Sequence, residues 1–291
     1  MTMKNLTHIL FASALSMALV SCDKSDPAAN NVTLHFNNTF KDKTIVLGDA
    51  HSSQVSVNTS AAGQTHQFAE LKYVVSNIRL VKTDGQEIPY NINDLDKGAT
   101  LIDQSKATTL TYILSDIPSG DYKQLKFGLG IKQELNTLDQ TRFPKFYATV
   151  SANDTKMMWE WGTGYRFTKI EGVYGPDKQT LSIHTGSTVG GKSDDPSSHI
   201  PGVDAYRDVT LPLPETALVG IGSPIITIKA DFDRLLSGKT NTITLTSGSG
   251  SNDNATPNVH TAMQMKKFVD NLGGNGDSDK SGMFSISSVK N

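Results

Sequence analysis

The stretch "LKFGLGI", residues 125–131, alternates apolar side chains with lysine and glycine. In an extended chain, residues two apart point to the same side, so its large apolar residues share one face. These residues are Leu125, Phe127, Leu129 and Ile131. The alternation predicts a β-strand with one buried face. Gly128 and Gly130 lie on the other face, where they predict close packing by a neighbouring segment.

Many other segments carry the same signature. They are rich in β-branched and aromatic residues, and Gly, Pro, Asn and Asp separate them. The predicted strands cover residues 32–36, 43–47, 71–81, 109–114, 122–131, 165–174, 180–184, 208–213, 224–232, 241–245 and 283–289. Neither a regular alternation of strands with helices nor an internal repeat is visible. We therefore predict an all-β fold, an antiparallel β-sandwich of many short strands.

One segment near the C-terminus has a helical period instead. Its apolar residues recur at helical spacing, at Ala262, Met265, Val269 and Leu272. Asn258 is the predicted N-cap and Gly273 the predicted stop. We expect one C-terminal α-helix, packed against the sandwich. Two stretches rich in Gly, Ser and Asn, residues 186–202 and 246–258, are predicted to be mobile loops.

The N-terminus has the organisation of an export signal. Lys4 precedes an apolar run from Ile9 to Val20, too short to span a bilayer as a helix, which needs about 20 residues. The run ends in "LVSC", which resembles the bacterial lipobox and predicts cleavage before Cys22 and lipidation of its thiol. Cys22 is the single cysteine, so an intramolecular disulfide is excluded. We assign residues 1–21 to a lipoprotein signal peptide.

These features predict the arrangement of the mature chain. Residues 22–31 form a flexible tether, and residues 32–291 form one sandwich domain that includes the C-terminal helix. Because acyl chains anchor without spanning, we expect membrane contact through the lipid alone, on the periplasmic side or at the cell surface, at the outer membrane. The formal net charge is -2 and like charges form no block, which argues against nucleic acid as a partner.

Both tryptophans of the chain lie in "MMWEWGTGYRFTKIEG", residues 157–172. If this segment is extended, Met157, Trp159, Trp161 and Tyr165 share one face. Such a stripe has three interpretations. It fills the core of a sandwich, it forms an aromatic platform that stacks on sugar rings, or it contributes to a metal site with Met and His ligands.

The order of residues in and after this segment resembles the MbnP-like copper-binding proteins. Their pattern is a Met-aromatic-Trp segment, then Gly-Tyr-x-Phe-x-Lys-x-(Glu/Asp)-Gly, then a strand that ends in His-x-Gly. The matching residues are Met157, Trp159, Gly164, Tyr165, Phe167, Lys169, Glu171, Gly172, His184 and Gly186. Residues 70–85, 120–131 and 259–271 are similar to further blocks of the family, in the same order. The resemblance covers nearly the whole mature chain.

The resemblance implies copper binding outside the cytoplasm. In the best-understood members of the family, one Trp is oxidised to kynurenine by a dihaem peroxidase-like partner, and the product helps to bind copper. Indole offers an N–H donor and no lone pair for a metal, whereas ring opening creates an amine and a ketone that can coordinate. Trp159 matches the family position, and Trp161 is the other candidate for oxidation. Tyr165 and Met157 are the expected neighbours of the site.

Histidine completes the predicted site, because imidazole suits copper. His184 holds the His-x-Gly position and is the expected ligand. His35 alternates away from an apolar pair, so it is either a second ligand or a solvated strand residue. Lys169 and Glu171 are predicted to pair on the surface. Three histidines in polar stretches are also predicted on the surface: His51, His66 and His199.

We therefore expect a binding protein and not an enzyme. The expected function is that of an extracytoplasmic copper-binding lipoprotein for copper acquisition, storage or delivery. No nucleophile elbow, phosphate-binding glycine loop or paired-histidine zinc motif accompanies the copper pattern. The alternative is a glycan-binding surface lipoprotein with Trp159, Trp161 and Tyr165 as its stacking face. A structural domain whose metal site has decayed is a third interpretation.

Overall fold

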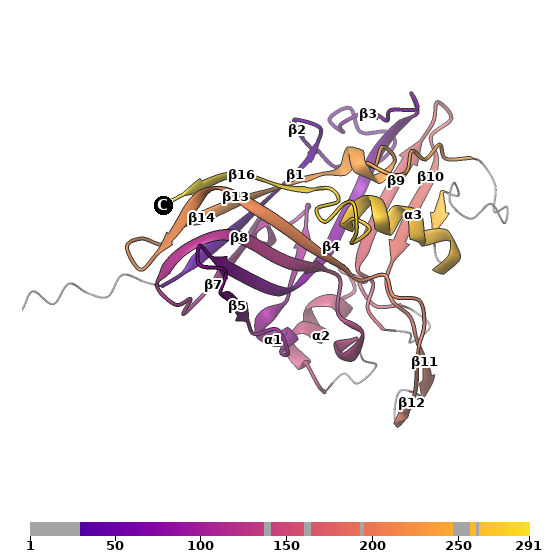
Figure 1. The fold of residues 1–291 in the computed structure, drawn as a ribbon. Helices are drawn as coiled ribbons and strands as arrows, with labels where there is room; N and C mark the ends of the chain where they lie inside the picture. The colour runs from indigo at the N-terminus through magenta and orange to yellow at the C-terminus, as the bar shows by residue number, and fades with distance from the viewer. Residues whose placement is uncertain (1–29, 137–140, 160–163, 193–194, 247–256, 260–261) are drawn as a thin grey trace, which may run out of the picture.

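Two β-sheets pack face to face in the computed structural model of the chain (Figure 1). The structure describes residues 30–136, 141–159, 164–192, 195–246, 257–259 and 262–291. A separate two-stranded hairpin, β11 (Val189–Lys192) and β12 (Asp195–Pro201), extends away from the two large sheets (Figure 1). The sandwich-like architecture agrees with the all-β prediction.

The smaller sheet has the order β16-β14-β1-β2, with β7 also paired to β1. Its strands are β1 (Val32–Phe40), β2 (Lys43–Thr44), β7 (Thr111–Leu114), β14 (Ile225–Asp231) and β16 (Phe284–Lys290). β1 and β14 run parallel, and the other pairs are antiparallel. The sheet therefore joins segments from both ends of the chain.

The larger sheet has the order β13-β8-β4-β9-β10-β15, and β3, β5 and β6 also pair with β4. Its strands are β3 (Asn58–Thr59), β4 (Thr65–Lys82), β5 (Glu87–Tyr90), β6 (Thr100–Asp103), β8 (Gly120–Leu129), β9 (Thr168–Tyr174), β10 (Gln179–Thr185), β13 (Arg207–Val219) and β15 (Asn258–Val259). β10 and β15 are parallel. β4, with 18 residues and five partner strands, is the central strand of the fold.

Aromatic rings fill the space between the sheets. Phe36 of β1 lies edge-on to Tyr73 of β4 and Phe127 of β8, with ring centroids 6.2 and 6.4 Å apart. The residues of the predicted alternation are all buried: Leu125, Phe127, Leu129 and Ile131. Close packing on the two glycines is also confirmed. A Cβ on Gly128 would lie 2.2 Å from the Tyr206 ring, and one on Gly130 would lie 2.3 Å from the Phe167 ring.

The predicted helix is present, and two shorter ones accompany it. The helices are α1 (Leu95–Gly98), α2 (Pro144–Ser151) and α3 (Ala262–Gly273). α3 packs against β10, β13 and the 3-10 turn η3 (Phe232–Leu235), the third such turn after η1 (Ala107–Leu110) and η2 (Gln133–Leu135). Asn258, the predicted N-cap, lies in β15 instead. None of the helices in the described part of the chain is long and apolar enough to cross a membrane.

Several details of the predicted fold are wrong. The sheets are mixed and not purely antiparallel, because β1 and β10 each have a parallel partner. β4 and β13 are long and not short: β4 pairs with five strands along its length, and β13 continues along β8 past a shift in register. Residues 241–245 form no ladder and contribute only a bridge between Ser237 and Thr242. Within the predicted loop 186–202, β11 and β12 form a hairpin.

Candidate metal site

Residues 157–159 and residues 164–166 lie antiparallel to each other, so the segment that carries Trp159 is not one continuous strand. Met158 and Tyr165 form an isolated antiparallel bridge. The backbone N–H of Trp159 donates to the Gly164 carbonyl at 3.1 Å. The Arg166 N–H donates to the Met157 carbonyl at 2.8 Å. These bonds hold the backbone of Trp159 beside Gly164. Trp161 lies outside the described residues.

Trp159 is buried beside His184. Its side chain is 3% exposed, and its ring centroid lies 6.5 Å from that of His184 with the planes inclined at 54°. The Arg166 guanidinium lies 5.2 Å from the centre of the indole, within cation–π range. Gly186 leaves room for the ring, because a Cβ there would lie 3.1 Å from the indole nitrogen. Trp159 and His184, the two main residues of the predicted site, are therefore neighbours.

His184 faces away from the sandwich interior. It forms a cross-strand row with Lys169 of β9 and Lys72 of β4, and residues in one row share a face. The next residue along β4, Tyr73, packs on Phe36 of the other sheet, so the row lies on the opposite face. The row is nevertheless buried, with His184 5% exposed.

The segment before Trp159 covers this row. Lys72 Nζ donates to the carbonyl oxygens of Asp154 and Thr155 at 2.7 and 3.2 Å. Arg166 donates from Nη1 to the Lys156 carbonyl at 2.7 Å. Two cationic side chains thus hold the backbone that leads into Trp159 over the outer face of the sheet.

Glu171 is a hydrogen-bond partner of His184, and Ser182 Oγ lies 3.4 Å from the same ring nitrogen. Glu171 Oε1 lies 2.8 Å from His184 Nε2 and 3.5 Å from Lys169 Nζ. The hydrogen bond from His184 lowers the pKa of Glu171 to about 2, and the Lys169 charge acts in the same direction, while burial opposes both. Glu171 is therefore a carboxylate at neutral pH and an acceptor for an imidazole N–H. A metal-binding His usually donates its second N–H to such a group.

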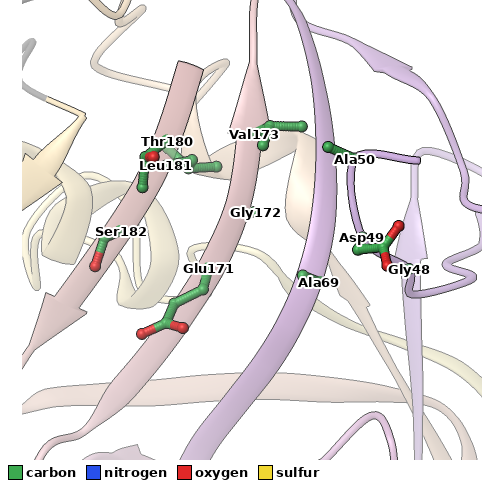
Figure 2. A pocket seen from close by; sticks show the side chains of 10 residues that line it. All are labelled: Gly48, Asp49, Ala50, Ala69, Glu171, Gly172, Val173, Thr180, Leu181 and Ser182. Carbon is green, nitrogen blue, oxygen red and sulfur yellow. The ribbon is translucent and has the colours of Figure 1, made fainter. Parts of the chain in front are cut away.

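A hollow of about 330 Å³ lies on the solvent side of Glu171. Figure 2 shows Glu171 on β9 and Ser182 on β10, with Asp49 and Ala50 in a loop beyond β4. The Glu171 side chain is 36% exposed. Glu171 thus lines the hollow and is also bonded to the buried imidazole.

The other candidate residues lie in different surroundings. Tyr165 is fully buried and packs edge-on to Phe146, with centroids 5.4 Å apart, and Met157 is also fully buried in the core. His35 is exposed on the outer face of the smaller sheet, with Nδ1 3.3 Å from Thr111 Oγ1. Its neighbour Phe36 points toward the larger sheet, so His35 points away from the sheet that carries His184.

Burial also bears on the glycan alternative. A platform that stacks on sugar needs exposed ring faces, and Trp159 and Tyr165 have none to offer. The predicted surface position of His66 is wrong as well, since it is 1% exposed. Lys169 does approach Glu171, but Lys169 is buried and not at the surface.

A family model described as MbnP matches residues 29–273. The chain belongs to the MbnP family. MbnP proteins are a methanobactin-associated family of copper proteins and are not known as enzymes. A solved structure, MbnP from Methylosinus trichosporium, superposes with a TM-score of 0.53 at 16% identity, over 88% of this chain and 97% of that one. At that identity the likeness concerns the fold. No functionally curated protein matches the chain.

His184 and Trp159 differ in what they can offer to a metal ion. Within the described ranges, no group of three or more His, Cys, Asp or Glu side chains is placed to hold a metal ion. His184 can supply an imidazole nitrogen, which suits copper. Unmodified indole cannot supply a second donor, because its nitrogen carries a proton and no lone pair for a metal.

Proposed function

We propose that this MbnP-family protein binds copper outside the cytoplasm and serves copper acquisition, storage or delivery. The observation that carries the proposal is the buried pair of Trp159 and His184, with Glu171 bonded to one nitrogen of the imidazole. Glu171 accepts a hydrogen bond from His184 Nε2. We therefore assign the other ring nitrogen of His184, the buried Nδ1, as the copper ligand. The carboxylate then orients the ligand and raises its basicity.

The second donor in this proposal is kynurenine formed from Trp159. Two molecules of hydrogen peroxide, used by a dihaem peroxidase-like partner, cleave the indole C2–C3 bond, add two oxygen atoms to the residue and leave as two molecules of water. Hydrolysis then releases formate and leaves an aryl amine and a ketone. The amine nitrogen and ketone oxygen supply the lone pairs that indole lacks. Together with His184 they form a site for copper.

Protein purified from its native host is expected to carry the modification. A peptide with Trp159 and Trp161 should be heavier than the sequence requires by the exchange of one carbon for one oxygen, and fragment ions should assign the change to Trp159. Copper should accompany the modified form. Unmodified Trp159 in protein that still binds copper tightly would contradict the kynurenine step, and unmodified protein without copper would contradict the proposed function.

His184→Gln is expected to weaken copper binding at least tenfold, because a metal ligand is lost. Competition with a copper chelator measures the affinity. His35→Gln is the matched control, since His35 is exposed on the far sheet and should leave the affinity unchanged. A loss in His35→Gln equal to that in His184→Gln would contradict the assignment of the site.

We also propose that the protein is a lipoprotein held at the outer membrane through Cys22. The support is the sequence of residues 1–22, which lies outside the described residues. A palmitate analogue supplied to cells should label the wild-type protein and leave Cys22→Ala unlabelled, since the acylated thiol is then absent. Equal labelling of the two would rule out this anchor.

A further inference from the structure

Two buried lysines lie side by side next to His184. Lys72 of β4, Lys169 of β9 and His184 of β10 pair directly in register. Lys72 is 3% exposed and Lys169 is 5% exposed. Like charges opposite each other destabilise a sheet, and lysine is almost never fully buried unless it is paired. The row therefore depends on compensating charges.

Carboxylates in the adjacent row supply the compensation. Glu70 and Glu171 also pair in register, and Glu70 bridges the lysines: Oε1 lies 2.5 Å from Lys72 Nζ and Oε2 lies 2.7 Å from Lys169 Nζ. Glu171 Oε1 lies 3.5 Å from Lys169 Nζ and 2.8 Å from His184 Nε2. Lys169 and His184 thus converge on one carboxylate oxygen. The charges form a continuous chain from Lys72 to His184.

This convergence matters because Glu171 is partly exposed at the hollow in Figure 2. A carboxylate at a water-filled edge can turn toward solvent unless a buried cation holds it. A neutral imidazole can carry its proton on either nitrogen, and the hydrogen bond at one nitrogen decides which. An acceptor fixed at Nε2 leaves the lone pair on Nδ1.

We propose that Lys169 is a positioning residue that holds Glu171 Oε1 against His184 Nε2 and so keeps His184 in one tautomer, with the proton on Nε2. Lys72 acts one step further away by fixing Glu70. The inference rests on the proposed function only in treating His184 as the copper ligand. The tautomer itself is a property of the metal-free protein.

Long-range 1H–15N NMR of the imidazoles in the full-length, metal-free protein tests the proposal, with the His184 signal assigned by its loss in His184→Gln. At mildly alkaline pH, wild-type His184 should show a protonated Nε2 and an unprotonated Nδ1. Lys169→Met should give a mixture of tautomers, and Lys169→Arg should restore the single form. Lys126→Met is the control, because Lys126 pairs with Glu87 elsewhere, at 2.7 Å. A single Nε2–H tautomer in Lys169→Met, or an Nδ1–H tautomer in the wild type, would overturn the proposal.

Copper titration of the same proteins, carrying the modified Trp159, separates this inference from the proposed function. Lys169→Met should weaken copper binding about 10–100-fold, the usual effect of losing an outer partner of a metal ligand, and Lys169→Arg should recover most of it. If the wild type binds no copper but the tautomers behave as stated, the proposed function fails and the inference stands. If Lys169→Met loses copper with its tautomer unchanged, the inference fails alone. Should Lys169→Met not fold, the wild-type tautomer alone carries the test, and an Nδ1–H form of His184 overturns the proposal.

Discussion

Gly172→Ala is expected to lower the free energy of unfolding by about 3–5 kcal/mol, at the upper end for a single methyl group. A Cβ on Gly172 would lie 1.9 Å from the Gln67 carbonyl oxygen and 3.0 Å from its carbonyl carbon. Both atoms belong to the backbone of β4, so no side-chain rotation can relieve the clash. β9 would have to move away from the central strand. Urea denaturation followed by circular dichroism measures the loss.

Gly175→Ala is the matched control for this prediction. Gly175 follows β9 directly, has a φ of +72°, and a Cβ there would meet nothing within 4 Å. Gly175→Ala is expected to lower the free energy of unfolding by about 1–2 kcal/mol, because only the left-handed conformation opposes an alanine there. A loss in Gly172→Ala no larger than that in Gly175→Ala would show that β4 and β9 are not in such close contact.

The close approach at Gly172 also arranges the charged rows. Gly172 pairs with Phe68, and the register then shifts so that Glu70 pairs with Glu171. A bulge of this kind turns side chains relative to the partner strand. The glycine in the family pattern thus permits the contact that sets the two carboxylates beside the lysines. We expect Gly172→Ala to disturb His184 together with the sheet.

The parts of the fold that sequence could predict are those with a local cause. The alternation in residues 125–131 follows from the two-residue period of a strand, and it predicts the buried face of β8 correctly. The buried face of α3 follows in the same way from helical spacing, as Met265, Val269 and Leu272 show. The parallel pairing of β1 with β14 joins residues almost two hundred positions apart, and no local pattern specifies it.

The candidate site likewise has features that the sequence could predict and features that it could not. The proximity of Trp159 and His184 could be predicted, because the family pattern contains both residues. The burial of Lys72 and Lys169 could not, because a lysine in an alternating strand normally marks the solvent face. Both lysines are buried because the segment before Trp159 covers the outer face of the sheet. That cover depends on the hydrogen bonds from Lys72 to the carbonyls of Asp154 and Thr155. The one sequence signal was the spacing of Lys169 and Glu171, which suggested an ion pair.

His66 is the clearest case in which polar neighbours in sequence misled the prediction, and its burial has a measurable consequence. Its ring lies between Phe40 and Phe68, with centroids 5.2 and 5.1 Å away, and Nδ1 is 3.5 Å from the Gln64 carbonyl oxygen. Burial lowers the pKa of His66 from 6.5 to about 4, although the contact with Gln64 opposes the shift. The folded protein therefore keeps His66 neutral where the unfolded chain would protonate it.

The stability of the protein is consequently expected to fall as the pH is lowered from 6.5 to 4. The unfolded chain binds the extra proton in this window, so the stability due to neutral His66 is complete above pH 6.5 and lost below pH 4. At about 1.36 kcal/mol per pKa unit, the loss is about 3 kcal/mol. Urea midpoints measured across this range give the free energy at each pH. His66→Leu should abolish most of the slope, because leucine does not titrate.

His51→Leu controls for the removal of an exposed histidine, and it should keep the wild-type slope. The carboxylate of Glu171 does not confuse the comparison. Its folded pKa of about 2 lies below the usual 4.5, so its contribution is present above pH 4.5 and is lost between pH 4.5 and 2. Equal slopes in the wild type and His66→Leu between pH 6.5 and 4.5 would contradict the burial of a neutral imidazole between the two phenylalanines, as would an NMR titration of His66 with a midpoint near 6.5.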